Sequence, residues 1–288
     1  MLSYTASSRF NFVRPTGAND IYDRYTHYAS YRLEAVYDNT LIVAHNIQEG
    51  TKFKLAYDFN HAFSKNDSAF VNDKTQDFGK VVLDLRRYQR IHQELILAMR
   101  FTGGSFLGPA KKNFLLGGMD NWLTGNSTNT TDPASPLYNT IFLDKRDLLF
   151  NKYVTNMRGF SYNQLYGNNH LVLNFEMRWP IIKYFYRGVI SSNFLKNLQL
   201  TGFYDLGTAW SGTNPWDEEN NFNTVTIAPP KNPFSAQVIN YRNPWLQGFG
   251  PGLRTMLLGY YLKLDLAWGV MDYVVKKPVW HVTLGYDF

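Results

Sequence analysis

The sequence contains no cysteine, which excludes disulfide scaffolds, Cys-ligated zinc or iron–sulfur sites, and a cysteine nucleophile. It also lacks any apolar run near the ~20 residues that a transmembrane helix requires. Charged residues make up only 18 % of the chain and aromatic residues 17 %, whereas a disordered protein shows the opposite balance. The net charge of +6 comes from scattered Lys and Arg, so nucleic acid is not an expected partner.

Motifs that carry catalysis are missing as well. The six histidines show no H-E-x-x-H or other close metal-ligand spacing, and there is no G-x-S-x-G nucleophile motif. The pair Gly117-Gly118 lacks the strand–loop–helix context of a phosphate loop. We therefore expect no metal, no cofactor and no enzymatic activity.

The strongest positive signal is the period-two alternation of apolar and polar residues that is typical of β-strands. In residues 171–179 the odd positions are apolar, and the even positions include Glu176 and Arg178. Residues 7–14 form a predicted tenth strand besides nine clearer ones. The nine clearer strands are predicted at 31–38, 51–60, 80–88, 94–101, 171–179, 198–210, 249–258, 260–268 and 279–288.

Two architectures accommodate such strands. A soluble β-sandwich buries the apolar faces, whereas a transmembrane β-barrel turns them toward lipid and keeps the polar faces in its lumen. The polar faces carry Arg, Lys, Glu or Asp in almost every strand, and strands of ~8–11 residues match a tilted membrane span. Aromatic residues recur at strand ends, as a bilayer interface favours: Trp179, Trp210, Trp268, Trp280 and Phe288. These features favour an all-β, antiparallel transmembrane β-barrel.

The predicted connections alternate between long and short. The long ones are 60–79, 102–169 and 211–248. Bacterial outer-membrane barrels have long external loops and short periplasmic turns, so the alternation places Phe288 at the periplasmic end.

Four segments occur in an order that resembles the BamA/TamA outer-membrane assembly superfamily, also called the bacterial surface antigen family. Residues 114–118 (FLLGG) are similar to the motif that opens the family's long sixth external loop. Residues 157–160 (MRGF) are similar to the V-R-G-F/Y signature inside that loop. The other two are 203–210 (FYDLGTAW), similar to the F-x-D-x-G-x-x-W strand, and 250–254 (GPGLR), near the C-terminal end.

The resemblance runs from about residue 31 to 288, with one departure. Residues 119–156 separate two motifs that are nearly contiguous in many members. The segment 118–122 is most similar to barrels from Bacteroidota.

The resemblance implies a barrel of about sixteen strands, of which nine or ten lie in this chain. Residues 1–30 are then an external loop or a partial strand, and residues 31–288 form the C-terminal part of the barrel. Neither an export signal nor the periplasmic POTRA domains of this family are recognisable, so we expect the chain to be the C-terminal part of a longer protein or an incomplete gene product. The long loop 102–169 is expected to fold into the lumen.

A charged cluster is the candidate site that the resemblance implies. Arg158, followed by Gly159 and Phe160, belongs to the loop whose arginine pairs with acidic residues of the barrel wall. Glu176 and Asp205 fall on the polar faces of their predicted strands. A planar guanidinium with five donors suits two carboxylates, and such pairing would pin the loop in the lumen. The alternative is that both carboxylates are ordinary residues of a hydrated lumen wall.

The C-terminal strand carries a second candidate feature. One face of residues 279–288 is an aromatic and aliphatic stripe that resembles the signal by which new barrels are recognised, through pairing of an exposed strand edge. The alternative is an ordinary last strand. The stripe consists of Trp280, Val282, Leu284, Tyr286 and Phe288.

Three functions fit these expectations. The first is insertion, assembly or translocation of outer-membrane proteins, with outer-membrane lipids, client proteins and accessory lipoproteins as partners. The second is a barrel anchor or secretion pore that serves an upstream propeller or enzyme domain. The third is a diffusion porin. All three place the protein in a bacterial outer membrane.

Overall fold

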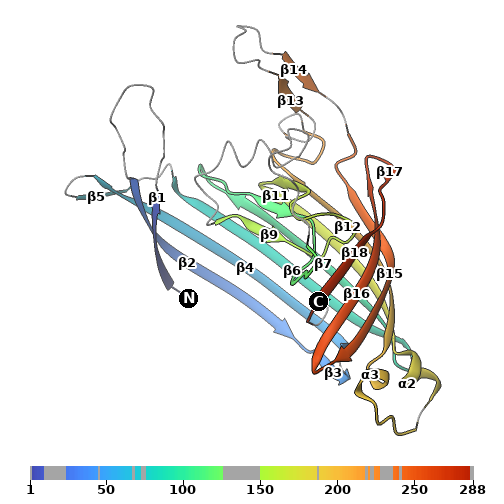
Figure 1. Cartoon of the computed structure of the whole chain (residues 1–288). Coiled ribbons are helices and arrows are strands. Elements are labelled where there is room, and N and C mark those ends of the chain that lie inside the picture. Colours follow the sequence, from blue (N-terminus) through green and yellow to red (C-terminus); the bar gives the residue numbers. More distant parts are fainter. Residues whose placement is uncertain are drawn as a thin grey trace.

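The computed structural model describes residues 2–9, 24–44, 46–66, 69–72, 76–125, 150–186, 188–217, 220, 224–227, 236–239 and 242–285. A single antiparallel sheet dominates it, and neighbouring strands follow one another along the chain. Figure 1 shows this sheet curving around a concave face. Its principal strands are β1 (Leu2–Arg9), β2 (Arg24–Asp38), β4 (Ile47–Asn66), β6 (Phe78–His92), β7 (Leu95–Leu107), β11 (Asn169–Trp179), β12 (Gln199–Trp210), β15 (Leu246–Leu257), β16 (Tyr260–Met271) and β18 (Val279–Leu284).

Shorter strands and two short helices lie in the connections between the principal strands. No helix among the described residues is both long and apolar enough to cross a membrane. Figure 1 shows the two short helices at the opposite end of the sheet from the β13–β14 hairpin. The short elements are β3 (Leu41–Ala44), β5 (Ala69–Asn72), β8 (Phe114–Leu116), β9 (Lys152–Val154), β10 (Leu165–Gly167), α2 (Ile181–Phe185), α3 (Asn193–Lys196), β13 (Thr224–Ile227), β14 (Ala236–Ile239) and β17 (Val274–Val275).

All nine clearer strands of the sequence prediction are present, and the predicted tenth strand is corrected. It lies at Leu2–Arg9 rather than at 7–14, and it pairs with β2 over its whole length. Only residues 7–9 of the predicted range belong to it, and 10–14 lie outside the described residues. The next strand, β2, already begins at Arg24.

Several strands are longer than the alternation predicts. β4 has 20 residues, and β7 continues to Leu107, so the predicted loops at 39–50, 60–79 and 102–169 are shorter. The end of β7 contains Gly103 and Gly104, which carry no alternation signal. It is nevertheless paired on both sides, with β6 and β11, so its backbone groups are satisfied without an apolar face.

Burial in the sheet is inverted relative to a soluble protein. In β11, the inward-facing Glu176 and Arg178 are each 1 % exposed, whereas the outward-facing Phe175 and Met177 are 38 % and 46 % exposed. A soluble sandwich would bury the apolar side chains and solvate the charged ones. An apolar outer surface instead requires lipid, as in a transmembrane barrel.

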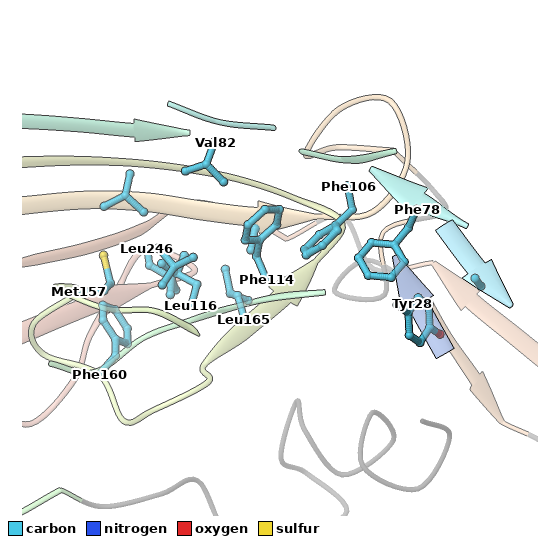
Figure 2. Close-up of a cluster of buried hydrophobic side chains, with 14 residues drawn as sticks. Tyr28, Phe78, Val82, Phe106, Phe114, Leu116, Met157, Phe160, Leu165 and Leu246 are labelled. Carbon is cyan, nitrogen blue, oxygen red and sulfur yellow. The ribbon is translucent and has the colours of Figure 1, made fainter. Parts of the chain in front are cut away.

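The concave face is covered by the long connection between β7 and β11. Its three short strands form a separate sheet in the order β10-β8-β9, and Phe114 of β8 lies 4.1 Å from the ring of His170 on the wall. Figure 2 shows the apolar cluster that results, with side chains from the loop and from the inner wall. We predicted a polar lumen and did not foresee this apolar layer. Its members include Tyr28, Phe78, Val82, Phe106, Phe114, Leu116, Met157, Phe160, Leu165 and Leu246.

Candidate functional site: the buried charge cluster

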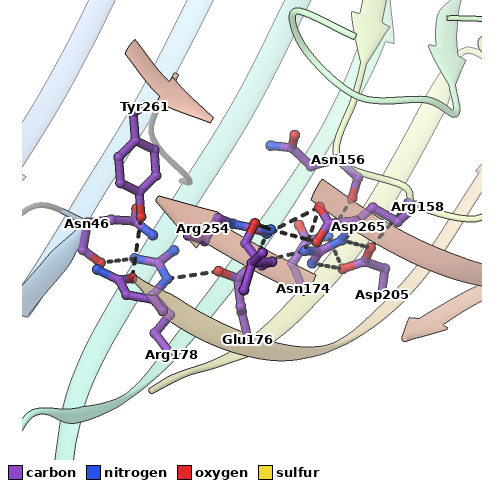
Figure 3. Close-up of polar contacts among 12 residues, drawn as sticks. Asn46, Asn156, Arg158, Asn174, Glu176, Arg178, Asp205, Arg254, Tyr261 and Asp265 are labelled. Carbon is purple, nitrogen blue, oxygen red and sulfur yellow. Dashed lines mark hydrogen bonds and ion pairs between the residues drawn. The ribbon is translucent and has the colours of Figure 1, made fainter. Parts of the chain in front are cut away.

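The long loop places Arg158 against the inner wall of the sheet, where it is 1 % exposed. Its Nε and Nη2 atoms donate hydrogen bonds of 2.7 and 2.8 Å to the two carboxylate oxygens of Asp205 on β12. Its Nη1 donates to Glu176 Oε2 of β11 at 2.9 Å, and its backbone N–H donates to Asp205 at 3.1 Å. The structure thus brings together Arg158, Glu176 and Asp205, as Figure 3 shows.

The cluster extends beyond these three residues to the neighbouring strands. Arg178 donates to Glu176 at 2.9 Å, and it also reaches the backbone carbonyl of Asn46 at 3.2 Å. Arg254 of β15 forms a two-pronged contact with Asp265 of β16, at 2.7 and 3.2 Å (Figure 3). Three guanidinium groups therefore face three carboxylates, and all six side chains are at most 2 % exposed.

The balance of charge explains how this cluster tolerates burial. Removal from water by itself lowers the pKa of Arg158, but attraction and hydrogen bonding to Asp205, with further attraction from Glu176 and Asp265, outweigh burial and raise that pKa. The guanidinium carbon also lies 3.7 Å from the centre of the Phe203 ring, a cation–π geometry. Loss of one partner would leave the remaining charged groups buried without a compensating charge, and such a loss strongly destabilises the folded state.

The two residues after Arg158 fix the position of the loop. Gly159 has a φ of +87°, and a Cβ at this position would lie 2.7 Å from the backbone nitrogen of Gly269. Its N–H donates to His281 Nε2 at 3.0 Å, which requires that nitrogen to be unprotonated. Phe160 is 2 % exposed and packs in the apolar cluster. The loop tip is therefore held by charge, by close backbone approach and by apolar packing.

Glycine in β15 allows the same close approach from the wall. A Cβ on Gly248 would clash with the carbonyl oxygen of Arg158. Gly248 thus leaves the wall without a side chain at the point where the loop backbone lies against it.

Sequence analysis missed several members of the cluster. It did not single out Arg178, Arg254, Asp265 and His281, although the alternation of inward-facing and outward-facing positions along a strand contains a signal for them. Asp265 falls on the polar face of residues 260–268, and Arg178 shares the inward face with Glu176. The parity test that selected Glu176 and Asp205 would have selected these residues as well.

The predicted C-terminal stripe is only partly described by the structure. Trp280 is 60 % exposed on the outer face of β18, and Val282 and Leu284 are partly exposed on the same face. Tyr286 and Phe288 lie outside the described residues, and β18 ends at Leu284 rather than at 288. The role of the stripe as an assembly signal stays a prediction.

The space beside the cluster suits water or ions better than an apolar ligand. A cavity of about 220 Å³ is lined by charged groups that include Arg86, Arg100, Glu176 and Lys263. Within the described part of the chain, no group of three or more His, Asp or Glu side chains is placed to hold a metal ion. The cluster joins the loop to the wall by hydrogen bonds and ion pairs, and none of its three carboxylates or three guanidinium groups is a nucleophile paired to a base.

Comparison with known proteins gives the family. No curated protein matches this chain. Among solved structures, it is similar to the crystal structure of BamA from Haemophilus ducreyi lacking POTRA domains 1-3, at 12 % identity and a TM-score of 0.41. That alignment covers 98 % of this chain and 59 % of the BamA chain, so this chain spans less than two thirds of its length. The Omp85 superfamily domain matches residues 5–288. This chain therefore belongs to the Omp85 superfamily of outer-membrane barrel proteins.

Proposed function

We propose that this chain is the C-terminal part of an outer-membrane barrel that inserts or translocates other outer-membrane proteins. In this proposal, Arg158 clamps the long loop inside the lumen through Asp205 and Glu176. The buried contacts of Arg158 with both carboxylates, at 2.7–2.9 Å, are the single observation that carries it. A pore for free diffusion has no need of a loop locked across its lumen by a desolvated charge cluster.

The mechanism requires neither a nucleotide nor a metal. A client strand pairs with an exposed strand edge, and its backbone hydrogen bonds and apolar burial in lipid supply the free energy. The clamped loop keeps the lumen occupied by the β8–β10 sheet and its apolar cluster. The wall around it then stays curved and in register while a strand edge is exposed. Outer-membrane lipids, client barrels and accessory lipoproteins are the proposed partners.

The proposal is tested by reconstitution of the protein in phospholipid vesicles. We expect it to accelerate the folding of an added, urea-unfolded outer-membrane barrel, measured by heat-modifiable mobility. Arg158→Ala should abolish most of the acceleration, because the loop is released. Arg86→Ala is the matched control, since Arg86 also faces the lumen and pairs with Asp84, but the two side chains are 26 % and 16 % exposed.

Two outcomes would contradict the proposal. Solute flux through the vesicles without any folding acceleration would indicate a diffusion porin. Neither flux nor acceleration, with the barrel fully folded, would indicate an anchor for another domain.

A further inference from the structure

Two short helices occupy the connection between β11 and β12, at the end of the sheet opposite the β13–β14 hairpin (Figure 1). Bacterial outer-membrane barrels have their long loops outside the cell and their short turns in the periplasm, so this end is the periplasmic one. Residues 180–198 contain Lys183, Arg187 and Lys196 but no Asp or Glu. The connection is therefore purely basic, unlike the strands on either side of it.

The first helix, α2, lies over the outer face of the barrel wall. Trp179 ends β11 on the same face as Phe175 and Met177, because alternate residues of a strand share a face. The rings of Tyr184 and Phe185 pack on the Trp179 ring, with centroid distances of 5.6 and 5.9 Å. The helix therefore continues the lipid-facing surface of the wall at its periplasmic end.

The second helix, α3, covers the same outer face two strands further along the sheet. Thr255 of β15 pairs with the outward-facing Leu262 of β16, yet it is only 3 % exposed. Its hydroxyl donates a hydrogen bond of 2.9 Å to the carbonyl of Phe194 in α3. On the other side, the Tyr184 hydroxyl of α2 lies 2.8 Å from a ring nitrogen of His92, at the β6–β7 turn. The connection is thus held against the wall from β6 to β15.

The connection carries a group of exposed apolar side chains. Phe185 is 71 % exposed and Val189 is 93 % exposed, and apolar residues grouped in this way mark an interaction surface. Because α2 packs on the outer face of β11, the bilayer that covers the wall is placed to cover this patch as well. The exposed apolar residues of the patch are Phe185, Tyr186, Val189, Phe194 and Leu195.

A hollow of about 600 Å³ lies beside this patch, between the connection and the β6–β7 turn. Its lining includes Arg90, Lys183 and Lys196, with one carboxylate, Glu94, among the described residues. Neither lysine forms an ion pair with any residue that the structure describes, whereas Arg90 contacts Glu49 at 2.7 Å. The hollow is therefore net positive, and its two ammonium groups are available to an anion.

We propose that the β11–β12 connection binds the headgroup of an anionic phospholipid in the periplasmic leaflet. The ammonium groups of Lys183 and Lys196 contact the lipid phosphate, and Phe185 and Phe194 lie among the first methylene groups of the acyl chains. Tyr186 belongs to both the hollow and the exposed patch, so one site meets both parts of an amphipathic lipid. The proposal requires a barrel in a membrane and is independent of any insertion activity.

The position of the connection is tested first. The chain has no cysteine, so F185C can carry a single bimane label, whose ring system replaces the phenylalanine ring. F175C, labelled in the same way, is the reference for a lipid-facing site. In phosphatidylcholine vesicles, lipids brominated in their acyl chains should quench both labels, and iodide on both sides of the membrane should quench neither strongly. Quenching of the F185C label by iodide alone would overturn the proposal, because the connection would then face the periplasm.

The headgroup preference is tested with the same F185C label. At equal mole fractions, brominated phosphatidylglycerol should quench it more than brominated phosphatidylcholine, because each lysine near the surface favours an anionic lipid about five-fold. K183Q/K196Q should therefore lower the ratio of the two binding constants by about ten-fold or more. K111Q/K277Q is the matched control, since it removes the same charge from exposed lysines outside the connection and should leave the ratio unchanged. An equal ratio with and without K183Q/K196Q, in a folded barrel, would contradict the headgroup site.

Discussion

The two halves of the sheet carry the same alternation of residues, yet their inward-facing charges experience different surroundings. On β2, β4 and β6, ion pairs such as Arg32–Asp58 and Lys80–Asp58 form a ladder with side-chain exposures of 14–42 %. On β11, β12, β15 and β16, the corresponding ion pairs are at most 2 % exposed. The difference is the Arg158 tip of the long loop, which lies against the ion pairs of the second half, whereas the loop meets β2 and β6 at apolar residues, with Phe150 packed against Tyr28 and Phe78.

This comparison shows that the position of a residue along its strand, odd or even, decides whether its charge faces inward. Contact with the loop tip then decides whether that charge is buried away from water. Exposed pairs contribute little because water solvates each partner alone. Buried pairs depend on every partner, because an unpaired charge cannot recover its hydration while it stays buried. Identical substitutions should therefore have unequal effects in the two halves.

The largest expected effect comes from Arg158→Ala. Removal of the guanidinium leaves Asp205 and Glu176 without their shared partner, at a cost of about 3–5 kcal/mol if they stay buried. The loop avoids this cost by leaving the wall, so docking is lost while the strands remain paired. We expect rapid protease cleavage of the loop in a barrel that still shows heat-modifiable mobility.

Arg158→Lys sharpens this test. Lysine keeps the charge but lacks the planar fork that contacts both oxygens of Asp205, so protection of the loop should be only partly restored. Cleavage of Arg158→Ala at the wild-type rate would contradict the clamp.

Gly159→Ala should have the next largest effect. The added Cβ meets the backbone of Gly269 at 2.7 Å, and the φ of +87° disfavours a side chain, so we expect a loss of about 2–4 kcal/mol of docking free energy. Gly202→Ala is the matched control, because a Cβ there meets nothing within 4 Å. Equal urea-unfolding midpoints and equal loop protection for the two variants would show that close approach at Gly159 is unimportant.

Lys152 offers a smaller, pH-dependent effect at the boundary between the two halves. Burial, with repulsion from Lys80 and Arg100, lowers the pKa of this loop residue to about 8, below its usual 10.5. The released loop binds more protons than the docked loop between these two values, so docking should strengthen as the pH rises from 8 toward 10. The rate of loop cleavage by protease in wild type, divided by the rate in Lys152→Met, should therefore fall as the pH rises from 8 toward 10. A constant ratio would contradict the prediction.

The smallest effect is expected in the open half of the sheet. Lys80 pairs with Asp58 at 2.8 Å, but the two side chains are 26 % and 14 % exposed. Lys80→Ala should change the free energy of unfolding by about 0–1 kcal/mol, measured in urea, and high salt should reduce the difference further. An effect as large as that of Arg158→Ala would remove the distinction between the two halves.

The alternation of residues along the chain was enough to predict the strands and their faces, because a period of two assigns alternate side chains to opposite sides of a sheet. It placed Glu176 and Asp205 on the inner face, and the MRGF motif suggested Arg158 as their partner. It predicted strand ends poorly, as in β4 and β7, because backbone groups that are paired with neighbouring strands need no apolar alternation.

The path of the loop through the lumen could not be predicted in the same way, because it depends on contacts between distant segments. Gly159 contacts His281 across 122 residues, and Asn121 contacts Leu284 across 163 residues. No local period encodes such contacts, since they depend on how the curved sheet places distant strands around one loop. The pairing of Arg254 with Asp265, the apolar cluster and the loop segment around Asn121 that lies beside β18 all depend on that arrangement.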